Sequence, residues 1–295
     1  MIIETHQLHK RYGKQTAVAG LNLQLPEGCI YALLGPNGAG KTTTLKMLMN
    51  LVEPTSGSGC VLGAPLQRIG RAELQQIGYI SENQEMPEWM RVEDFLAFCQ
   101  PFYPSWDQEL CNQMVANFEL PLGRKLKELS HGSRLKASLV SSLAYRPRLL
   151  VIDEPFGGLD PLVREELVSA ILACAGDGNC STIISTHDIA EIDRIVDRIG
   201  ILKTGTLIVQ ESLSELQQRF RRVVARIEDA AITQSPLPSW LDLQVDLPML
   251  SFVESQYSAE LGERVRAIYP QASEIEAKPM SLKEIFVSLS KNQNL

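Results

Sequence analysis

A glycine-rich stretch near the start of the chain, GPNGAGKTT at residues 35–43, has the residue types and spacing of a phosphate-binding loop. Glycines let backbone N–H groups approach phosphate oxygens, and a following helix directs its positive end at the same anion. Lysine adds a charge for the β- and γ-phosphates, and threonine adds a hydroxyl for Mg²⁺. We therefore predict a nucleoside triphosphate site formed by Gly35, Pro36, Asn37, Gly38, Ala39, Gly40, Lys41, Thr42 and Thr43.

Two acidic residues and a histidine follow two later apolar runs, RLLVIDEP and STIISTHD. Ligands of parallel sheets bind at the carboxyl ends of the strands, so we expect these side chains beside the phosphate loop. There Asp153 can hold Mg²⁺ together with Thr42. Glu154 can polarise a water for attack on the γ-phosphate, and a neutral His187 can hydrogen-bond that phosphate or the water. The pattern indicates hydrolysis as well as binding.

The elements around these residues predict an α/β fold of the P-loop NTPase (RecA-like) type. Alternating polar and apolar residues over 1–13 and 15–28 indicate an antiparallel β subdomain. Continuous apolar runs, each ending next to a candidate site residue, indicate a buried parallel core between helices. These runs are 29–35, 148–153 and 181–186. Helices are expected at 41–52, 161–176 and 188–197, and a hairpin of strands at 198–210. A helical lobe is expected at about 84–147.

The pattern changes after about residue 211, where no chemical motif follows. We expect a small α+β appendage over 211–295, next to a nucleotide-binding domain over 1–210. Its expected helices are 212–220, 259–269 and 281–290, and its expected strands are 221–229 and 241–253.

The bulk composition excludes several other classes. A net charge of −7 gives no general attraction for nucleic acid or anionic lipid. The six cysteines show no CxxC spacing, which is typical of free thiols in a reducing compartment. The first residues lack the order of a signal peptide, and no window approaches the roughly 20 apolar residues of a membrane helix. We expect a soluble chain without a transmembrane segment.

Taken together and in this order, the motifs resemble those of the nucleotide-binding subunit of ATP-binding cassette (ABC) transporters, over residues 1 to about 210. The resemblance makes 35–43 the Walker A loop and 149–154 the Walker B strand. It also assigns five single residues: Tyr12 stacks on adenine, Glu154 is the catalytic glutamate, Asp160 in GLDP is the D-loop acid, His187 is the switch histidine, and Ser130 is the serine of the signature loop.

The signature differs from the family pattern, because LSHGS at 129–133 stands where the family has LSGGQ. Ser130 and Gly132 are kept, His131 replaces a glycine, and Ser133 replaces a glutamine. The loop still offers a hydroxyl, a close backbone N–H and a helix N-terminus. His131 must avoid positive φ or bear strain. We expect Ser130 and Gly132 to contact the γ-phosphate of another chain, with His131 tolerated.

A second difference concerns the loop after the strand GYIS, where the family usually places a glutamine. Glu82 occupies that position in this chain, and Gln84 follows two residues later. The sequence favours Glu82 as the positional match and leaves Gln84 open.

The resemblance implies ATP and Mg²⁺ as cofactors and a head-to-tail pair with a second nucleotide-binding subunit, either identical or a paralogue. It further implies an integral membrane permease as partner, no nucleic acid, and a peripheral place at the cytoplasmic face of the cell membrane. The acid at 82, the lobe and the appendage favour an exporter-type (ABC-2-like) cassette. The alternatives are a soluble ABC ATPase that acts on ribosomes or DNA and a P-loop GTPase. The chain lacks a second cassette, a long coiled-coil insert and an NKxD-type guanine reader.

Overall fold

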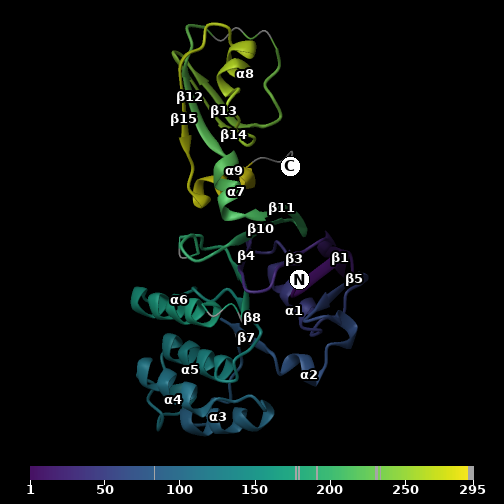
Figure 1. Ribbon diagram of the computed structural model, residues 1–295, viewed down its shortest axis with the longest axis vertical. Helices are drawn as coiled ribbons and strands as arrows, with labels where there is room; N and C mark the ends of the chain where they lie inside the picture. Colours follow the sequence, from purple (N-terminus) through teal and green to yellow (C-terminus); the bar gives the residue numbers. More distant parts are fainter. Residues whose placement is uncertain are drawn as a thin grey trace. The chain divides into compact units, whose positions relative to one another are not determined.

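The computed structural model describes residues 1–82, 84–176, 178, 180–190, 192–229, 232 and 234–291. The chain divides into two compact units, Met1–Gln210 and Glu211–Leu295 (Figure 1).

The first unit is organised by a six-stranded sheet whose strand order is β11-β10-β4-β9-β8-β7. Neighbouring strands from β10 to β7 run parallel, and a two-residue turn joins β10 to β11. Every residue of β4, β8 and β9 is buried, which confirms the prediction from continuous apolar runs. The strands are β4 Ile30–Leu34, β7 Ile77–Ser81, β8 Leu149–Asp153, β9 Ser181–Thr186, β10 Arg198–Lys203 and β11 Thr206–Ser212.

Helices follow β4 and β8 and cover the sheet. Helix α1 (Lys41–Leu48) ends before Asn50 takes a φ of 55°, and α6 (Pro161–Ala175) starts with a proline at its first turn. The short α2 (Arg71–Leu74) and η1 (Leu66–Arg68) precede β7.

The predicted helix at 188–197 is wrong, because its described residues contain turns at 190 and 192–195 and no helix. Ile192 and Ile195 donate N–H bonds three residues back, while Asp193 and Val196 donate four residues back. The apolar side chains at 189, 192, 195 and 196 are buried with helix-like spacing, yet they belong to separate turns. The sequence pattern correctly indicated burial here, and the helix was the wrong inference from it.

The predicted antiparallel subdomain is present and packs beside α1. β1 pairs antiparallel with β2, β3 and β5, and β5 pairs with β6. Leu45 and Leu48 of α1 share a core with the inward residues of these strands. The strands are β1 Ile3–Tyr12, β2 Gln15–Leu21, β3 Gln24–Leu25, β5 Ser56–Val61 and β6 Ala64–Pro65.

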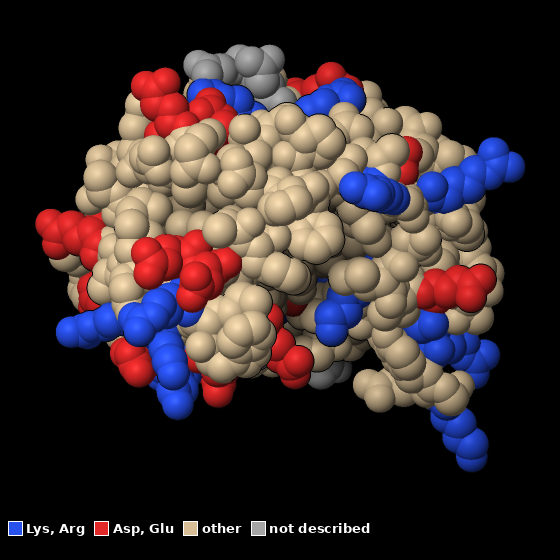
Figure 2. Space-filling view, turned by 90° about the horizontal axis from the view of Figure 1, so that it is seen from below, with Lys and Arg blue, Asp and Glu red and all other residues tan. Residues whose placement is uncertain are grey.

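The predicted helical lobe contains α3 (Val92–Cys99), η2 (Gln100–Phe102), α4 (Gln108–Asn117), η3 (Leu126–Glu128) and α5 (His131–Leu143). Stacked rings of Tyr103 and Tyr145, 3.7 Å apart, hold the segment after α3 against the end of α5. The surface seen from the lobe side carries both signs of charge around an uncharged centre (Figure 2). Trp89, Phe98 and Phe102 are exposed apolar residues of this lobe.

The second unit is an antiparallel sheet with strand order β13-β14-β12-β15, flanked by helices. The expected single strand at 241–253 is wrong, because a turn at 247–248 divides it into β13 and β14. Val223, Phe252 and Val265 belong to one buried cluster between the sheet and α8. The elements are α7 Leu213–Arg219, β12 Arg221–Arg226, β13 Trp240–Asp246, β14 Met249–Glu254, α8 Leu261–Ile268, β15 Ser273–Pro279 and α9 Leu282–Lys291.

None of the helices in the described ranges combines the length and the apolar composition that crossing a membrane requires.

Candidate nucleotide-binding and hydrolysis site

The loop between β4 and α1 needs glycine at three positions. Gly38 and Gly40 have φ values of 81° and 102°, in the left-handed region that side chains disfavour. A Cβ on Gly35 would lie 2.6 Å from the carbonyl oxygen of Leu202, and a Cβ on Gly40 would overlap the carbonyl oxygen of Ala17. The loop backbone therefore lies too close to its neighbours for any other residue at 35 and 40.

The substitution Gly40→Ala is expected to destabilise the protein more than Gly63→Ala does. Gly63 has a φ of 81°, and a Cβ there would meet nothing within 4 Å, so G63A adds backbone strain of about 1–2 kcal/mol alone. G40A adds the overlap with Ala17, which overpacking data put at about 1–3 kcal/mol more. Thermal unfolding of both variants measures the difference. Equal unfolding midpoints would contradict this account of the loop.

Lys41, the first residue of α1, directs its ammonium group back into the loop. Its Nζ donates to the carbonyl oxygens of Gly35 and Pro36 at 2.7 and 3.2 Å, and forms an ion pair with Glu154 Oε1 at 2.9 Å. The side chain is only 5% exposed, so all these contacts lie in a largely desolvated site. A cation held in this loop matches the predicted phosphate ligand.

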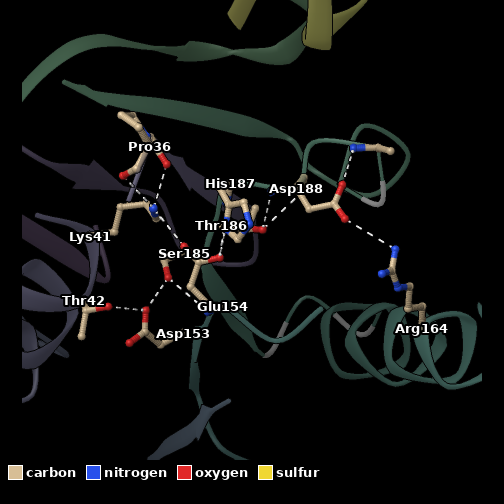
Figure 3. A network of polar contacts seen from close by, with 12 residues as sticks. Pro36, Lys41, Thr42, Asp153, Glu154, Arg164, Ser185, Thr186, His187 and Asp188 are labelled. Carbon is tan, nitrogen blue, oxygen red and sulfur yellow. Dashed lines mark hydrogen bonds and ion pairs between the residues drawn. The ribbon is translucent and has the colours of Figure 1, made fainter. Parts of the chain in front are cut away.

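Asp153, the last residue of β8, lies beside the phosphate loop, as predicted. Its Oδ1 accepts hydrogen bonds from the hydroxyls of Thr42 at 3.0 Å and Ser185 at 2.5 Å (Figure 3). Thr42 comes from α1 and Ser185 from β9, so three elements meet at one carboxylate. The carboxylate and the threonine hydroxyl are the hard oxygen donors that Mg²⁺ prefers, and the two residues therefore fit this ion.

Glu154 connects the lysine to the predicted histidine. Its Oε2 lies 2.8 Å from Nδ1 of His187, while its Oε1 pairs with Lys41 (Figure 3). Burial raises the pKa of Glu154, but the hydrogen bond and charge of Lys41, joined by His187, outweigh burial and hold this pKa below its usual value. The carboxylate is thus ionised at neutral pH, as a proton acceptor must be.

The backbone of Glu154 is itself unusual, since its φ is 50°. This left-handed conformation is strained for a residue with a side chain, and such strain is common at functional sites. Its N–H donates to the carbonyl oxygen of Ser185 at 3.0 Å, which anchors the strained residue to β9.

The signature loop begins α5 as a capped helix. Ser130 Oγ accepts a hydrogen bond from the N–H of Ser133 at 3.2 Å and donates to Ser133 Oγ at 3.0 Å. His131 is the first residue of α5 and has helical backbone, so it avoids the strain considered from the sequence. A Cβ on Gly132 would lie 3.0 Å from Val163, so this glycine also lets α5 approach α6 closely.

Two other predicted residues lie outside the group formed by Lys41, Asp153 and Glu154. Tyr12 is exposed at the end of β1, with the ammonium of Lys10 5.0 Å from the centre of its ring. Asp160 caps α6 and accepts from the N–H of Val163 at 3.0 Å. Both remain predicted contacts of a ligand or of a second chain.

Glu82 and Gln84 point to different neighbours. The N–H of Glu82 donates to the carbonyl oxygen of Asp153 at 3.2 Å. A Cβ on Gly157 would lie 2.6 Å from Glu82 Oε1, so this carboxylate lies next to the segment after Glu154. Gln84 Oε1 instead accepts from the hydroxyl of Ser138 in α5 at 2.7 Å.

Sequence reasoning missed Ser185, which contacts both acids. The available signal was a small polar residue near the carboxyl end of the buried run STIIST. A buried hydroxyl needs a hydrogen-bond partner, and the strand order supplies Asp153 as that partner.

A phosphate loop between a buried parallel strand and a helix, with two acids at the end of another strand, defines a P-loop nucleoside triphosphatase. A family model described as ABC transporter matches residues 18–157. A second model, described as AAA domain, putative AbiEii toxin, Type IV TA system, matches residues 122–193.

Three relatives extend the match beyond these motifs. The chain is 32% identical over 219 residues to the uncharacterized ABC transporter ATP-binding protein YhaQ of Bacillus subtilis (strain 168), covering 72% of this chain and 71% of the relative. It is 31% identical to the bacitracin transport ATP-binding protein BcrA of Bacillus licheniformis, covering 75% and 73%. It is 33% identical to the Nod factor export ATP-binding protein I of Burkholderia orbicola (strain AU 1054), covering 70% of each.

A solved structure of the ATP binding subunit of an ABC transporter superimposes with a TM-score of 0.69, at 27% identity, covering 74% of this chain and 92% of that one. A dimeric bacterial ABC transporter cassette, at 23% identity and a TM-score of 0.64, shares the fold. The chain therefore belongs to the ATP-binding proteins of ABC transporters, and it is an ATPase. The predicted family and fold class are confirmed.

Proposed function

We propose that this chain powers a membrane exporter by hydrolysing ATP in a head-to-tail pair with a second copy. The observation that best supports hydrolysis is the contact of Glu154 with both Lys41 and His187, at 2.9 and 2.8 Å. An ionised carboxylate lies here between the cation for the β- and γ-phosphates and an imidazole. A base in this place is beside the phosphate that water attacks.

Lys41 has two roles in this mechanism: without nucleotide it holds Glu154, and with ATP it binds phosphate. When ATP binds, phosphate oxygens replace three partners of its ammonium group, which are the carbonyl oxygens of Gly35 and Pro36 and the carboxylate of Glu154. Glu154 is then free to accept a proton from water, and His187 hydrogen-bonds the γ-phosphate or that water. Thr42 and Asp153 would hold Mg²⁺, which would supply positive charge to neutralise the charge that develops on the phosphate oxygens.

The second half of the site comes from the other copy. The capped start of α5, with Ser130 and Gly132, is proposed to face the γ-phosphate bound by the partner chain. Asp160 at the start of α6 lies along the same proposed interface, and Tyr12 stacks on the adenine. One chain has one phosphate loop, so a paired site requires two chains.

Glu82 is proposed to take the place of the family's glutamine after β7. The hydrogen bond of its backbone to Asp153 and the contact of its carboxylate with Gly157 support this assignment. Gln84, held by Ser138, is proposed to support the lobe instead.

The permease partner and the export direction rest on the relatives, two of which are named for bacitracin transport and Nod factor export. A peripheral place on the cytoplasmic face of the membrane follows from such a partner. The transported substrate is recognised by the permease in this proposal.

Co-purification tests the partnership. The tagged chain, extracted in mild detergent from its native cells, is expected to retain an integral membrane protein, which mass spectrometry identifies. A chain carrying Gly63→Ala, in the turn between β5 and β6, serves as a control that should retain the same protein. Recovery of ribosomal proteins or DNA without a membrane protein would contradict the proposal.

A further inference from the structure

Ser185 is a fully buried serine at the next-to-last position of β9. Its hydroxyl donates to Asp153 Oδ1 at 2.5 Å, and its carbonyl oxygen accepts the N–H of Glu154 at 3.0 Å. The same N–H lies 3.3 Å from the serine hydroxyl oxygen. One residue therefore contacts the side chain of one acid and the backbone of the next (Figure 3).

The sheet register produces this arrangement. β8 and β9 run parallel, with Asp153 directly paired to Ser185. The chain leaves β8 immediately afterwards through Glu154, whose φ is 50°. The N–H of Glu154 would otherwise lack a partner in the strand ladder, and the peptide of Ser185 supplies one.

Asp153 is only 4% exposed, and a buried carboxylate must be hydrogen-bonded to remain charged and oriented. Two hydroxyls meet at its Oδ1, and one of them, Thr42, is itself proposed as a metal ligand. Ser185 is the other donor to this carboxylate, and it is not proposed to contact the metal itself. Such outer donors fix the orientation of the ligands that they contact.

We propose that Ser185 is a positioning residue that orients Asp153 toward Mg²⁺. This inference rests on the proposed function of the site, in which Asp153 and Thr42 hold that ion. Loss of the Ser185 hydroxyl removes one of the two hydroxyl donors that the described part of the chain places at Asp153 Oδ1. The shorter backbone bond from the Glu154 N–H to the carbonyl oxygen of residue 185 is retained, and only its longer 3.3 Å contact with the hydroxyl is lost, so the main effect falls on the metal ligand.

The test compares ATP affinity with Mg²⁺ and with EDTA, measured by isothermal titration calorimetry. Wild type is expected to bind ATP more tightly with Mg²⁺. In Ser185→Ala, the ratio of ATP affinity with Mg²⁺ to ATP affinity in EDTA is expected to fall by about 10- to 100-fold, the usual cost of removing an outer donor. The affinity in EDTA itself is expected to be unchanged. Ser185→Thr keeps a hydroxyl and is expected to recover the gain.

Ser181→Ala is the matched control. Ser181 is a buried serine at the opposite end of the same strand, and its hydroxyl accepts the N–H of Gly28 at 2.8 Å. It should lose stability as S185A does, yet keep the full magnesium response. If S185A does not fold, Ser185→Cys, with similar volume and a weaker donor, takes its place.

An equal magnesium response in the position-185 variant and S181A would overturn the inference. The same conclusion would follow if S185T behaved as S185A. Failure of wild type to bind ATP at all would instead refute the proposed function of the site, so the two failures are distinct.

Discussion

Replacement of Glu154 by Gln is expected to reduce ATP turnover about 10²- to 10⁴-fold, the usual contribution of a general base. The amide has the same shape as the carboxylate but cannot accept the proton of the attacking water. ATP binding should persist, because Lys41 and the loop glycines are unchanged. Phosphate release gives the turnover, and equilibrium titration gives the affinity.

Glu165→Gln is the control for this substitution. Glu165 lies on α6, is 63% exposed, and pairs with Arg194 at 3.5 Å, away from the phosphate loop. This variant should turn over ATP at the wild-type rate. Wild-type turnover by E154Q itself would show that another group acts as the base.

The substitution Ser130→Arg is expected to abolish ATP-driven dimerisation. It is combined with E154Q so that bound ATP is not hydrolysed during the measurement. E154Q alone should form dimers when ATP is added, because both halves of each site are intact. Arginine removes the N-cap of α5 and fills the place where Ser130 is proposed to meet the partner's phosphate. The double variant should therefore remain monomeric, as measured by light scattering after gel filtration.

Loss of a cap alone must be separated from loss of the interface. Ser212 is also an N-cap: it begins α7 and accepts the N–H of Glu215 at 3.2 Å. Ser212→Arg in the E154Q background should lower stability by a similar amount, about 1 kcal/mol, and still permit ATP-driven dimers. If the Ser130→Arg, E154Q double variant still forms dimers with ATP, then LSHGS acts only as a helix cap and does not contact the partner's phosphate.

The central sheet could be predicted because its strands are buried on both faces. Short continuous apolar runs such as 29–35 and 148–153, each ended by a glycine or an acid, are typical of buried parallel strands. Edge elements were harder to predict. β15 (Ser273–Pro279) was missed because it is an edge strand in which charged residues alternate with Ile275 and Ala277, and its strand conformation depends on pairing with β12.

The site could be predicted where a motif fixes both residue type and place. Lys41, Thr42, Asp153, Glu154 and His187 were identified, and the structure brings them together. The directions of Glu82 and Gln84 could not be predicted, because their partners come from segments far away in the chain. Ser185 was missed for the same reason, since its role depends on the register between β8 and β9.

Mixing the two single variants tests most directly whether two chains share one site. E154Q keeps its signature loop, and S130R keeps its phosphate loop and base, so a mixed pair contains one intact site. The ATP turnover of the mixture should exceed the sum of the rates of the two variants measured separately. A mixture whose rate equals that sum, at concentrations where wild type is fully active, would contradict a site shared between two copies.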